Sequence, residues 1–456
     1  FMDLGGGATL FRRTCQRFQR ARLQPPVVLI PAAQTGHVRE ELRNLGLLGR
    51  ARIVAEPQPR GTAVSALAAA LLIAEQDPRG LMLLTPSDHV VADKAAFLSA
   101  VVAAVPAARA GHVALFGIEP TRAEAEYGYI GVDPARRDSD PPWPVTHFVE
   151  KPPREAAANL VESGEYFWNV GLVLSRADIL LTAARHLAPN LLNNTRRAIA
   201  TARRDGIIVR PAVPPWQAAG PASLERAFVE RMEGLRCVPL NCGWEDLGSW
   251  PALYRRLPHN EKGNAVVGES LLEEVRDSLV WNAGGPLLAM AGLRDVVAVS
   301  TPDAVLLCDM ERADAAVRFA RRLSRAGRPE ALTPSTISSP WGNVRNIERG
   351  EGYFLRLLTL RPEVTLALPT NRRRDELWVV LDGKVHAELG EEPPRLLTAG
   401  ESIVVPRGLT RRLENVGTDE ARVLEVQLDA RIPSVSAGQG RESEAPPTPG
   451  RLRSGG

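Results

Sequence analysis

Two acidic segments carry carboxylates at positions suited to holding a metal ion. In "NCGWEDLGSW", residues 241–250, Glu245 and Asp246 stand between Gly-Trp and Gly-Ser-Trp, and in "TPSDH" Asp88 follows an apolar run. Glycines let the backbone turn tightly around an acidic side chain, and a carboxylate fixed in this way suits Mg²⁺. Two acids from distant strands are what a metal that bridges a nucleotide's phosphates requires. Read alone, each segment also fits an acidic turn that binds nothing.

Two further segments carry side chains that suit a phosphorylated sugar. In "HFVEKPP" the adjacent Glu150 and Lys151 precede a proline pair, so an extended backbone sends their side chains in different directions. The carboxylate can accept from sugar hydroxyls and the ammonium can pair with a phosphate. In "EYFWNVGLVLSRAD", Asn169 precedes Gly171, and a carboxamide can both donate to and accept from a sugar. A solvated loop is the competing interpretation of Glu150 and Lys151.

A run of three arginines, Arg372 to Arg374, interrupts the alternating apolar segment "LALPTNRRRDELWVVLDG". It fits a nucleic-acid patch, a solvated hairpin, or a binding site whose original residues have been replaced. The chain has 56 Lys and Arg against 53 Asp and Glu, so its net charge of +3 creates no strong field for nucleic acid. No aromatic platform accompanies the run, which disfavours the nucleic-acid interpretation.

Cysteine spacing and hydropathy point to a cytoplasmic protein. The four cysteines are scattered without metal-binding spacing, which indicates free thiols in a reducing compartment. No apolar run reaches the roughly 18 residues of a membrane span, and no signal pattern opens the chain. Because residue 1 is Phe and residue 2 is Met, the sequence is expected to lack its natural beginning.

The elements that must position these residues change character along the chain. Short apolar runs such as "PVVLIPA", "ARIVAE" and "GLMLLTPSDHV" alternate with helical stretches at 36–46, 63–76 and 94–109, which predicts a parallel α/β sheet. "TPSDH" then lies at the carboxyl end of a strand, where ligands bind. We expect an α/β domain over 1–265, a connecting subdomain over 266–335, a small all-β barrel or jelly roll over 336–430, and a disordered tail over 431–456.

Taken in order, these motifs resemble the bacterial bifunctional mannose-1-phosphate guanylyltransferase/mannose-6-phosphate isomerase family. The resemblance covers about residues 1 to 428 and implies a Rossmann-like, glycosyltransferase-A-like nucleotidyltransferase domain followed by a cupin. The motifs that carry it are "EPQPRGTA" (56–63), "TPSDHVV" (85–91), "EYGYI" (126–130), "FVEKP" (148–152), "FWNVGLVLSRAD" (167–178), "GWEDLGSW" (243–250), "GRPE" (327–330), "SPWG" (339–342) and "VPRGLTRRLEN" (405–415).

The resemblance implies that mannose 1-phosphate attacks the α-phosphorus of GTP, releasing pyrophosphate and leaving GDP-mannose. It assigns Mg²⁺ binding to two acids and phosphate neutralisation to a lysine, and it places the remaining residues around the two substrates. These residues are Asp88 and Asp246 for Mg²⁺, Lys151 for the sugar phosphate, Glu150, Asn169, Gly171 and Gly128 for the mannose pocket, and Glu56 and Thr62 for the nucleotide side.

Several positions of the first domain depart from the family pattern. Gly61 and Val64 replace an Asn and a Pro at the pocket edge, and Glu225 replaces an Asp. The family opens with a strand and a glycine-rich phosphate loop, whereas Phe1 aligns after both. The "GGGATLFRRT" segment at 5–14 is interpreted as a plain loop. A chain that starts at Phe1 would lack the phosphate loop and a central strand.

In the cupin, the family's metal-binding histidines are replaced. Asn371 and Arg373 stand in its first histidine run, Glu376 alone remains of the expected ligands, and Arg411 stands at the second histidine position. A guanidinium has no lone pair to give a metal. We therefore predict a cupin without metal and without isomerase activity, in which Arg373 and Arg411 face one another and Glu376 is their nearest anionic partner.

Two functions remain open from the sequence. One is a GDP-mannose-forming enzyme with an inert cupin. The other is a non-catalytic protein that binds a sugar nucleotide or sugar phosphate, whose cationic cupin pocket holds an anion or whose barrel makes oligomer contacts. Both interpretations expect small-molecule partners rather than nucleic acid or membrane, and both are compatible with a homodimer.

Overall fold

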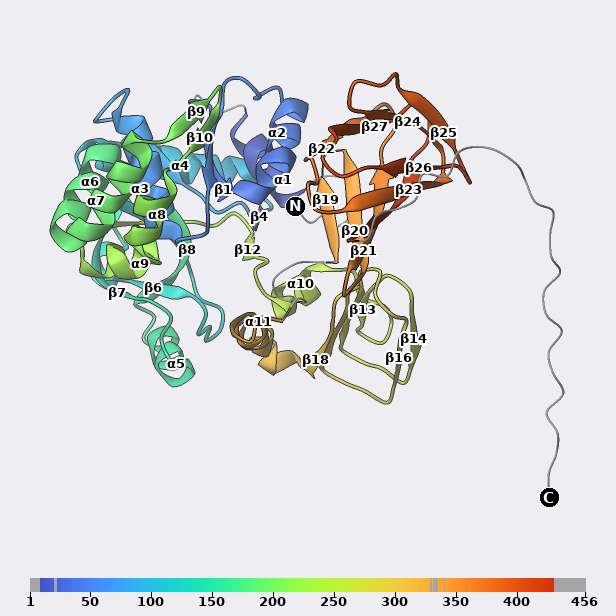
Figure 1. Cartoon of the computed structure of the whole chain (residues 1–456). Helices are drawn as coiled ribbons and strands as arrows, with labels where there is room; N and C mark the ends of the chain where they lie inside the picture. The colour runs from blue at the N-terminus through green and yellow to red at the C-terminus, as the bar shows by residue number, and fades with distance from the viewer. Residues whose placement is uncertain (1–8, 20–22, 329, 331–334, 340, 430–456) are drawn as a thin grey trace, which may run out of the picture. The chain divides into compact units, whose positions relative to one another are not determined.

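The computed structural model describes residues 9–19, 23–328, 330, 335–339 and 341–429 (Figure 1). The glycines at 5–7 and the expected disordered tail at 431–456 lie outside these residues. Contacts within the chain divide it into two compact units, Phe1–Leu332 and Thr333–Gly456. None of the helices in the described ranges has the length and apolar character needed to cross a membrane.

A four-stranded sheet of order β1-β2-β10-β9 opens the first unit. β1 pairs in parallel with β2, and β2 pairs in parallel with β10, as expected for strands that helices separate along the chain. The strands are β1 (Val27–Pro31), β2 (Arg52–Glu56), β9 (Arg203–Asp205) and β10 (Ile208–Arg210), and the helices beside them are α1 (Leu10–Phe18) and α2 (Thr35–Asn44).

The second sheet has the order β3-β8-β5-β11-β7-β6 and is mixed rather than parallel. The long strand β8 lies between β3 and β5 and runs antiparallel to both, so the expectation of an all-parallel sheet is wrong here. Apolar strands buried on both faces look alike in the sequence whichever way their neighbours run. The strands are β3 (Leu81–Leu84), β5 (Ala114–Ile118), β6 (Gly128–Val132), β7 (Trp143–Val149), β8 (Tyr166–Arg176) and β11 (Arg236–Pro239).

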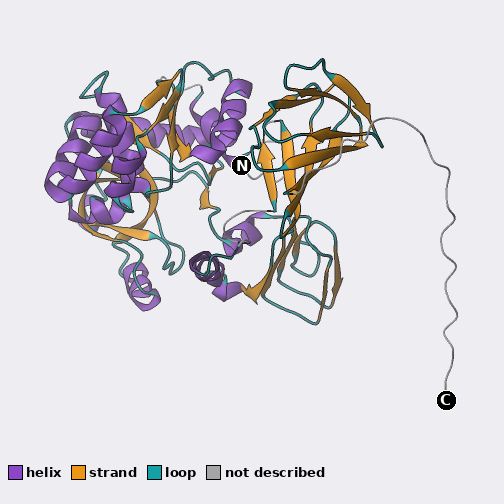
Figure 2. Ribbon diagram, in the orientation of Figure 1, coloured by secondary structure: helices purple, strands orange, loops and turns teal. Residues whose placement is uncertain are grey.

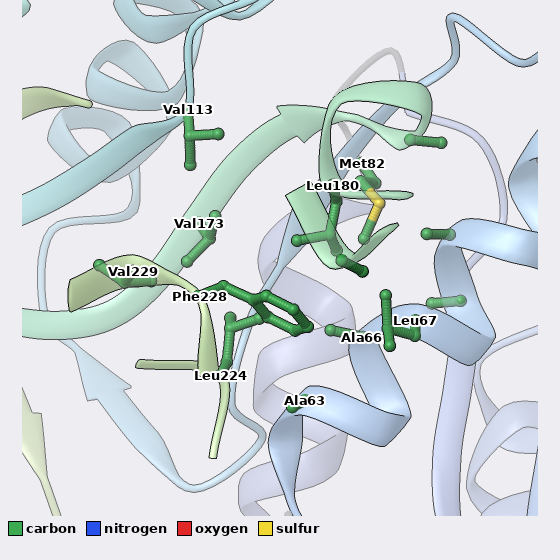
Figure 3. Close-up of a cluster of buried hydrophobic side chains, with 14 of the residues drawn as sticks. Ala63, Ala66, Leu67, Met82, Val113, Val173, Leu180, Leu224, Phe228 and Val229 are labelled. Carbon is green, nitrogen blue, oxygen red and sulfur yellow. The ribbon is translucent and has the colours of Figure 1, made fainter. Parts of the chain in front are cut away.

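Helix α3 (Thr62–Ala74) packs against both sheets. Its alanines and leucines favour helix and are buried around most of its circumference. Figure 3 shows the ring of Phe228 lying beside Ala66 and Leu67 of α3. The other helices of the α/β region are α4 (Lys94–Arg109), α5 (Arg154–Glu162), α6 (Ala177–Leu187), α7 (Pro189–Ala200), α8 (Val213–Ala219), α9 (Leu224–Ala227) and α10 (Trp250–Arg256).

β1 and β3 are the end strands of the two sheets, and both contact α3. Within the described residues no strand pairs with the outer edge of either one. Each of the two sheets therefore ends at a strand that contacts α3.

After α10 the chain winds through short strands that alternate between two small sheets. β13, β15 and β17 pair in parallel in one sheet, and β14 pairs in parallel with β16 in the other. This coil and the following helix belong to the first unit by their contacts. The elements are β13 (Ala265–Val267), β14 (Ser270–Glu273), β15 (Leu279–Asn282), β16 (Leu288–Ala291), β17 (Val296–Ser300), β18 (Val305–Asp309) and α11 (Ala315–Arg325).

The second unit is a β barrel built from a six-stranded and a four-stranded antiparallel sheet (Figure 2). Apolar side chains from both sheets, among them Trp378, fill its interior. The strands are β19 (Thr336–Ser339), β20 (Gly342–Gly350), β21 (Tyr353–Leu360), β22 (Thr365–Leu368), β23 (Asp375–Asp382), β24 (Lys384–Leu389), β25 (Arg395–Thr398), β26 (Ser402–Val405), β27 (Arg411–Asn415) and β28 (Ala421–Leu428).

Candidate functional site

A two-stranded ribbon brings the two acidic segments together. β4 (His89–Val91) pairs antiparallel with β12 (Trp244–Asp246), and Asp246 lies opposite His89, the residue after Asp88. Burial lowers the pKa of the His89 imidazole, while the nearby carboxylates of Asp246 and Asp88 act in the opposite direction. Both carboxylates therefore lie within electrostatic range of one buried ring. The Oδ1 of Asp246 also accepts a hydrogen bond of 2.7 Å from the Gly248 backbone N–H, which orients the carboxylate.

Aromatic rings connect this ribbon to strands β6 and β8. The Trp244 ring contacts the His89 ring edge-on at 5.1 Å between centroids and the Tyr127 ring at 5.7 Å. Tyr127 in turn contacts Trp168 of β8 at 5.4 Å. Burial, reinforced by the negative charge of Asp246, raises the pKa of Tyr127 to about 12. The tryptophan beside Asp246 thus fixes the ribbon against the strands that carry the expected sugar residues.

The expected sugar residues come together from three strand segments. Gly128 of β6 pairs with Asn169 of β8. A Cβ atom on Gly128 would lie 2.9 Å from Oε2 of Glu150 and 3.3 Å from Cβ of Asn169. A Cβ at 128 would also lie 3.0 Å from Phe148 Cζ, so a larger residue there would displace the Glu150 carboxylate toward the space beside Asn169.

Gly171 joins this pocket to the acidic ribbon. Its φ of +69° favours glycine, and its N–H donates to the Asn169 Oδ1 at 3.2 Å. A Cβ atom at Gly171 would lie 3.5 Å from Pro86 Cγ and 3.9 Å from His89 Cε1. The predicted metal carboxylates and the predicted sugar residues therefore border one region of the first unit.

A group of carboxylates surrounds Glu150. Burial, followed by the negative charge of Glu225, raises the pKa of Glu150 to about 7, although Lys151 acts in the opposite direction. The Glu150 backbone N–H donates to Oε1 of Glu230 at 3.0 Å. Sequence reasoning noted Glu225 only as a departure and did not find Glu230. No local signal could have found Glu230, because it lies 80 positions along the chain from Glu150.

Lys151 is exposed, and its Nζ lies 3.4 Å from Oε2 of Glu126. Its φ of +48° is unusual for a residue with a side chain. An exposed ion pair between a lysine and a glutamate contributes little stability. Lys151 can therefore leave Glu126 and pair with a phosphate at a small cost in free energy.

The two residues expected on the nucleotide side lie at the start of α3 and at the end of β2. Glu56 is buried, its Oε1 accepts a 2.6 Å hydrogen bond from Ser65 Oγ, and burial raises its pKa. The Thr62 Oγ1 accepts from the Leu224 backbone N–H at 2.8 Å. No described contact joins either residue to Asp88 or Asp246, so the structure does not bring them into the same cluster.

The departures at the pocket edge fit their positions. Gly61 has a φ of +83°, and a Cβ atom there would approach the Ala222 carbonyl oxygen to 2.3 Å. Val64 is fully buried in the core beneath α3. Both residues therefore serve local packing.

The acidic ribbon suits a divalent cation that shares its ligands with phosphate. Asp88 and Asp246 supply hard carboxylate oxygens, and among the described residues no three His, Cys, Asp or Glu side chains are arranged so that they could hold a metal by themselves. A cation held by two carboxylates takes its other ligands from substrate and water. The two carboxylates therefore suit a cation that also binds substrate and water better than they suit a metal site in which the protein supplies every ligand.

The barrel holds a buried ion pair at the positions where the resemblance implies metal ligands. Nη2 of Arg411 lies 2.7 Å from Oε1 of Glu376, and the two side chains are only 4% and 1% exposed. Asn371 Nδ2 donates to the same Oε1 at 3.0 Å. Burial raises the pKa of Glu376 to about 7, and the adjacent Glu425 acts in the same direction. These residues do not fit a metal, because the one remaining carboxylate is already engaged by a guanidinium.

We expected Arg373 and Arg411 to face one another inside the barrel, and the structure does not show this arrangement. Arg373 lies on the exposed side of the 369–374 loop and lines a surface cavity, whereas Arg411 is buried. The loop is held by Asn371 Oδ1, which accepts the backbone N–H groups of Arg373 and Arg374 at 3.1 Å each. This turn directs consecutive arginines outward.

Comparison with known proteins identifies the family of each part of the chain. Residues 1–263 match the family model described as nucleotidyl transferase, and residues 326–433 match the model described as mannose-6-phosphate isomerase C-terminal. A xanthan biosynthesis protein of Xanthomonas campestris is 33% identical over 427 residues, covering 94% of this chain and 90% of the relative. A mannose-1-phosphate guanylyltransferase of Escherichia coli K12 is 34% identical over 433 residues, with the same coverage.

A solved structure supports the same relationship. The crystal structure of a protein from Thermus thermophilus, described as a mannose-1-phosphate geranyltransferase, superposes with a TM-score of 0.57 at 26% identity. It covers 70% of this chain and 90% of its own. The chain therefore belongs to the bifunctional mannose-1-phosphate guanylyltransferase/mannose-6-phosphate isomerase family.

Proposed function

We propose that the first unit transfers GMP from GTP to mannose 1-phosphate, with Mg²⁺ as the cation. The observation that supports this proposal is the β4–β12 ribbon, in which Asp246 lies opposite His89, the residue after Asp88. Gly171, which borders His89, is hydrogen-bonded to Asn169 of the expected sugar residues. An oxygen of the sugar phosphate attacks the α-phosphorus of GTP, the bond to the pyrophosphate oxygen breaks, and GDP-mannose and pyrophosphate leave.

The residues of the chain position the reactants and neutralise charge. Asp88 and Asp246 would hold the cation, which supplies positive charge to the phosphates when bound. Lys151 pairs with the phosphate of the sugar, and Glu150 and Asn169 bind its hydroxyls. Positioning and electrostatic stabilisation of this kind account for most of the catalysis in phosphoryl transfer.

The barrel is proposed to contribute no metal-dependent isomerase activity. Its only remaining candidate ligand, Glu376, is paired with Arg411 at 2.7 Å. The test is conversion of mannose 6-phosphate to fructose 6-phosphate in the presence of added Zn²⁺, Co²⁺ or Mg²⁺. Turnover that a chelator abolishes would contradict this part of the proposal.

Pyrophosphate release from GTP, mannose 1-phosphate and Mg²⁺ tests the transferase directly. Asp246→Ala is expected to reduce kcat by at least about a hundredfold, because it removes a group that acts on the transferring phosphates. Glu245→Gln is the matched control, since neighbouring residues of a strand face opposite ways and Glu245 lies 4.0 Å from Arg256.

Two outcomes would overturn the proposal. Equal loss in Glu245→Gln and Asp246→Ala would sink the metal assignment. Binding of GDP-mannose without any pyrophosphate release would favour a non-catalytic, sugar-nucleotide-binding protein.

A further inference from the structure

A surface cavity of about 400 Å³ opens beside the 369–374 loop of the barrel. Strand β20, strand β28 and this loop supply its walls. The lining residues are Arg349, Asn371, Arg373, Arg374, Gln427 and Asp429.

The groups beneath the cavity form a polar network. Asn371 from the wall donates to Glu376, which pairs with Arg411. Gln427 from the wall donates to Glu425 at 3.0 Å, and Glu425 pairs with Arg356 at 2.5 Å. Each of the two arginines beneath the cavity is therefore already paired with a glutamate.

The wall, by contrast, carries an excess of positive charge. Arg374 pairs with Asp429 at 2.5 Å, which cancels the only acid of the lining. Arg349 and Arg373 form no ion pair with any described residue; Arg349 lies over the Phe354 ring, with Cζ 5.8 Å from its centroid. A cation–π contact of this kind does not use the N–H groups of the guanidinium as hydrogen-bond donors. Two such donors on one cavity suit a tetrahedral oxyanion, to which arginine donates in pairs.

We propose that this cavity binds a phosphate group without a metal ion, through Arg349 and Arg373. The site goes beyond the transferase of the first unit and uses none of its residues. It also differs from a metal-binding cupin site. The Arg411–Glu376 ion pair occupies the position of the metal ligands, and the phosphate would be bound by the arginines of the cavity wall instead. Asn371 connects the two, since it both caps the arginine turn and donates to Glu376.

Calorimetric titration of the full chain with inorganic phosphate in EDTA at low ionic strength tests the proposal. Removing one charge-assisted contact weakens such binding by about tenfold or more. We expect Arg349→Ala and Arg373→Ala each to raise the phosphate Kd by at least that factor, and Arg373→Lys to raise it less. Arg412→Ala is the matched control, because Arg412 lies on the same barrel and pairs with Glu388 outside the cavity.

The first unit also binds phosphates under the proposed function, so Lys151→Ala separates the two sites. Phosphate binding that persists in Lys151→Ala but weakens in Arg373→Ala supports the barrel site. An unchanged Kd in both cavity variants would overturn the proposal. Binding that EDTA abolishes, or binding of acetate tighter than that of phosphate, would also overturn it. Amide exchange of β23 and β28 in each variant verifies that the barrel remains folded.

Discussion

The buried Glu376 is predicted to destabilise the barrel at high pH despite its ion pair with Arg411. Its pKa rises from 4.5 to about 7, because burial and the neighbouring Glu425 disfavour the charged form more than Arg411 favours it. An acid whose pKa is raised in the folded state stabilises that state below its unfolded pKa and loses this contribution as pH rises through the folded value. The relevant window therefore runs from about pH 4.5 to about pH 7.

The magnitude follows from the two pKa values. At about 1.4 kcal/mol for each pKa unit, raising the pKa from 4.5 to about 7 corresponds to about 3 kcal/mol at most. Most of this loss, about 2–3 kcal/mol, falls between pH 5 and pH 8. Glu376→Gln resembles the protonated side chain, so the variant should escape the loss. Relative to the parent protein, it should gain about 2–3 kcal/mol of barrel stability between these two pH values.

Hydrogen exchange of the amides in β23 and β28 measures the stability of the barrel separately from the first unit. The comparison is between the parent protein and Glu376→Gln at pH 5 and pH 8, each corrected for the intrinsic exchange rate at that pH. Removing one partner of a stabilising buried pair typically costs about 3–5 kcal/mol. The reasoning would be refuted if Glu376→Gln were less stable than the parent protein by this amount at both pH 5 and pH 8. That result would show that the attraction of Arg411 for the Glu376 carboxylate outweighs the cost of burying its charge.

Three further predictions concern the first unit. Gly128→Ala should raise KM for mannose 1-phosphate by about tenfold and leave KM for GTP unchanged, because its Cβ meets Glu150 Oε2 at 2.9 Å; Gly131→Ala on the same strand is the control, and equal effects of the two would contradict the pocket. In steady-state assays from pH 6 to pH 8, KM for mannose 1-phosphate should fall as Glu150, with its pKa of about 7, ionises and becomes a better acceptor. In Glu150→Gln, KM should vary with pH only as far as the ionisation of the substrate itself requires. A KM–pH profile identical to that of the parent protein would show that Glu150 does not bind the sugar. Gly61→Ala should lower the free energy of unfolding by about 1–3 kcal/mol in denaturant titration, because the Ala222 carbonyl blocks a Cβ there; an unaffected midpoint would count against this close approach.

The sequence predicted helices well where long runs of alanine and other helix-favouring residues occur. The predicted helices at 63–76 and 94–109 correspond to α3 at Thr62–Ala74 and α4 at Lys94–Arg109. The mixed sheet around β8 was not predicted, because a strand that is buried on both faces has the same apolar pattern whichever way its neighbours run. The division of the strands into two sheets depends on strand pairing, which hydrophobic patterning does not encode.

The site was predictable only in part, for a similar reason. Asp88 and Asp246 could be singled out by their glycine and strand contexts, but their meeting depends on the pairing of β4 with β12. The carboxylates around Glu150 come from distant segments of the chain, and no local spacing signals them. In the barrel, the replaced ligand at 411 was visible as an arginine, whereas its pairing with Glu376 depends on side-chain packing between two sheets.

The central claim is that Asp88 and Asp246 act as one unit in transferring GMP to mannose 1-phosphate. The most direct test is a double-mutant cycle on GDP-mannose formation with Asp88→Ala, Asp246→Ala and the double variant, at saturating Mg²⁺. Substitutions of groups that hold the same ion have strongly non-additive effects. Each single substitution should therefore lower kcat/KM by about a thousandfold, and the double substitution should lower it by no more than about a further tenfold. Losses that multiply, or a single variant with the activity of the parent protein, would contradict the account.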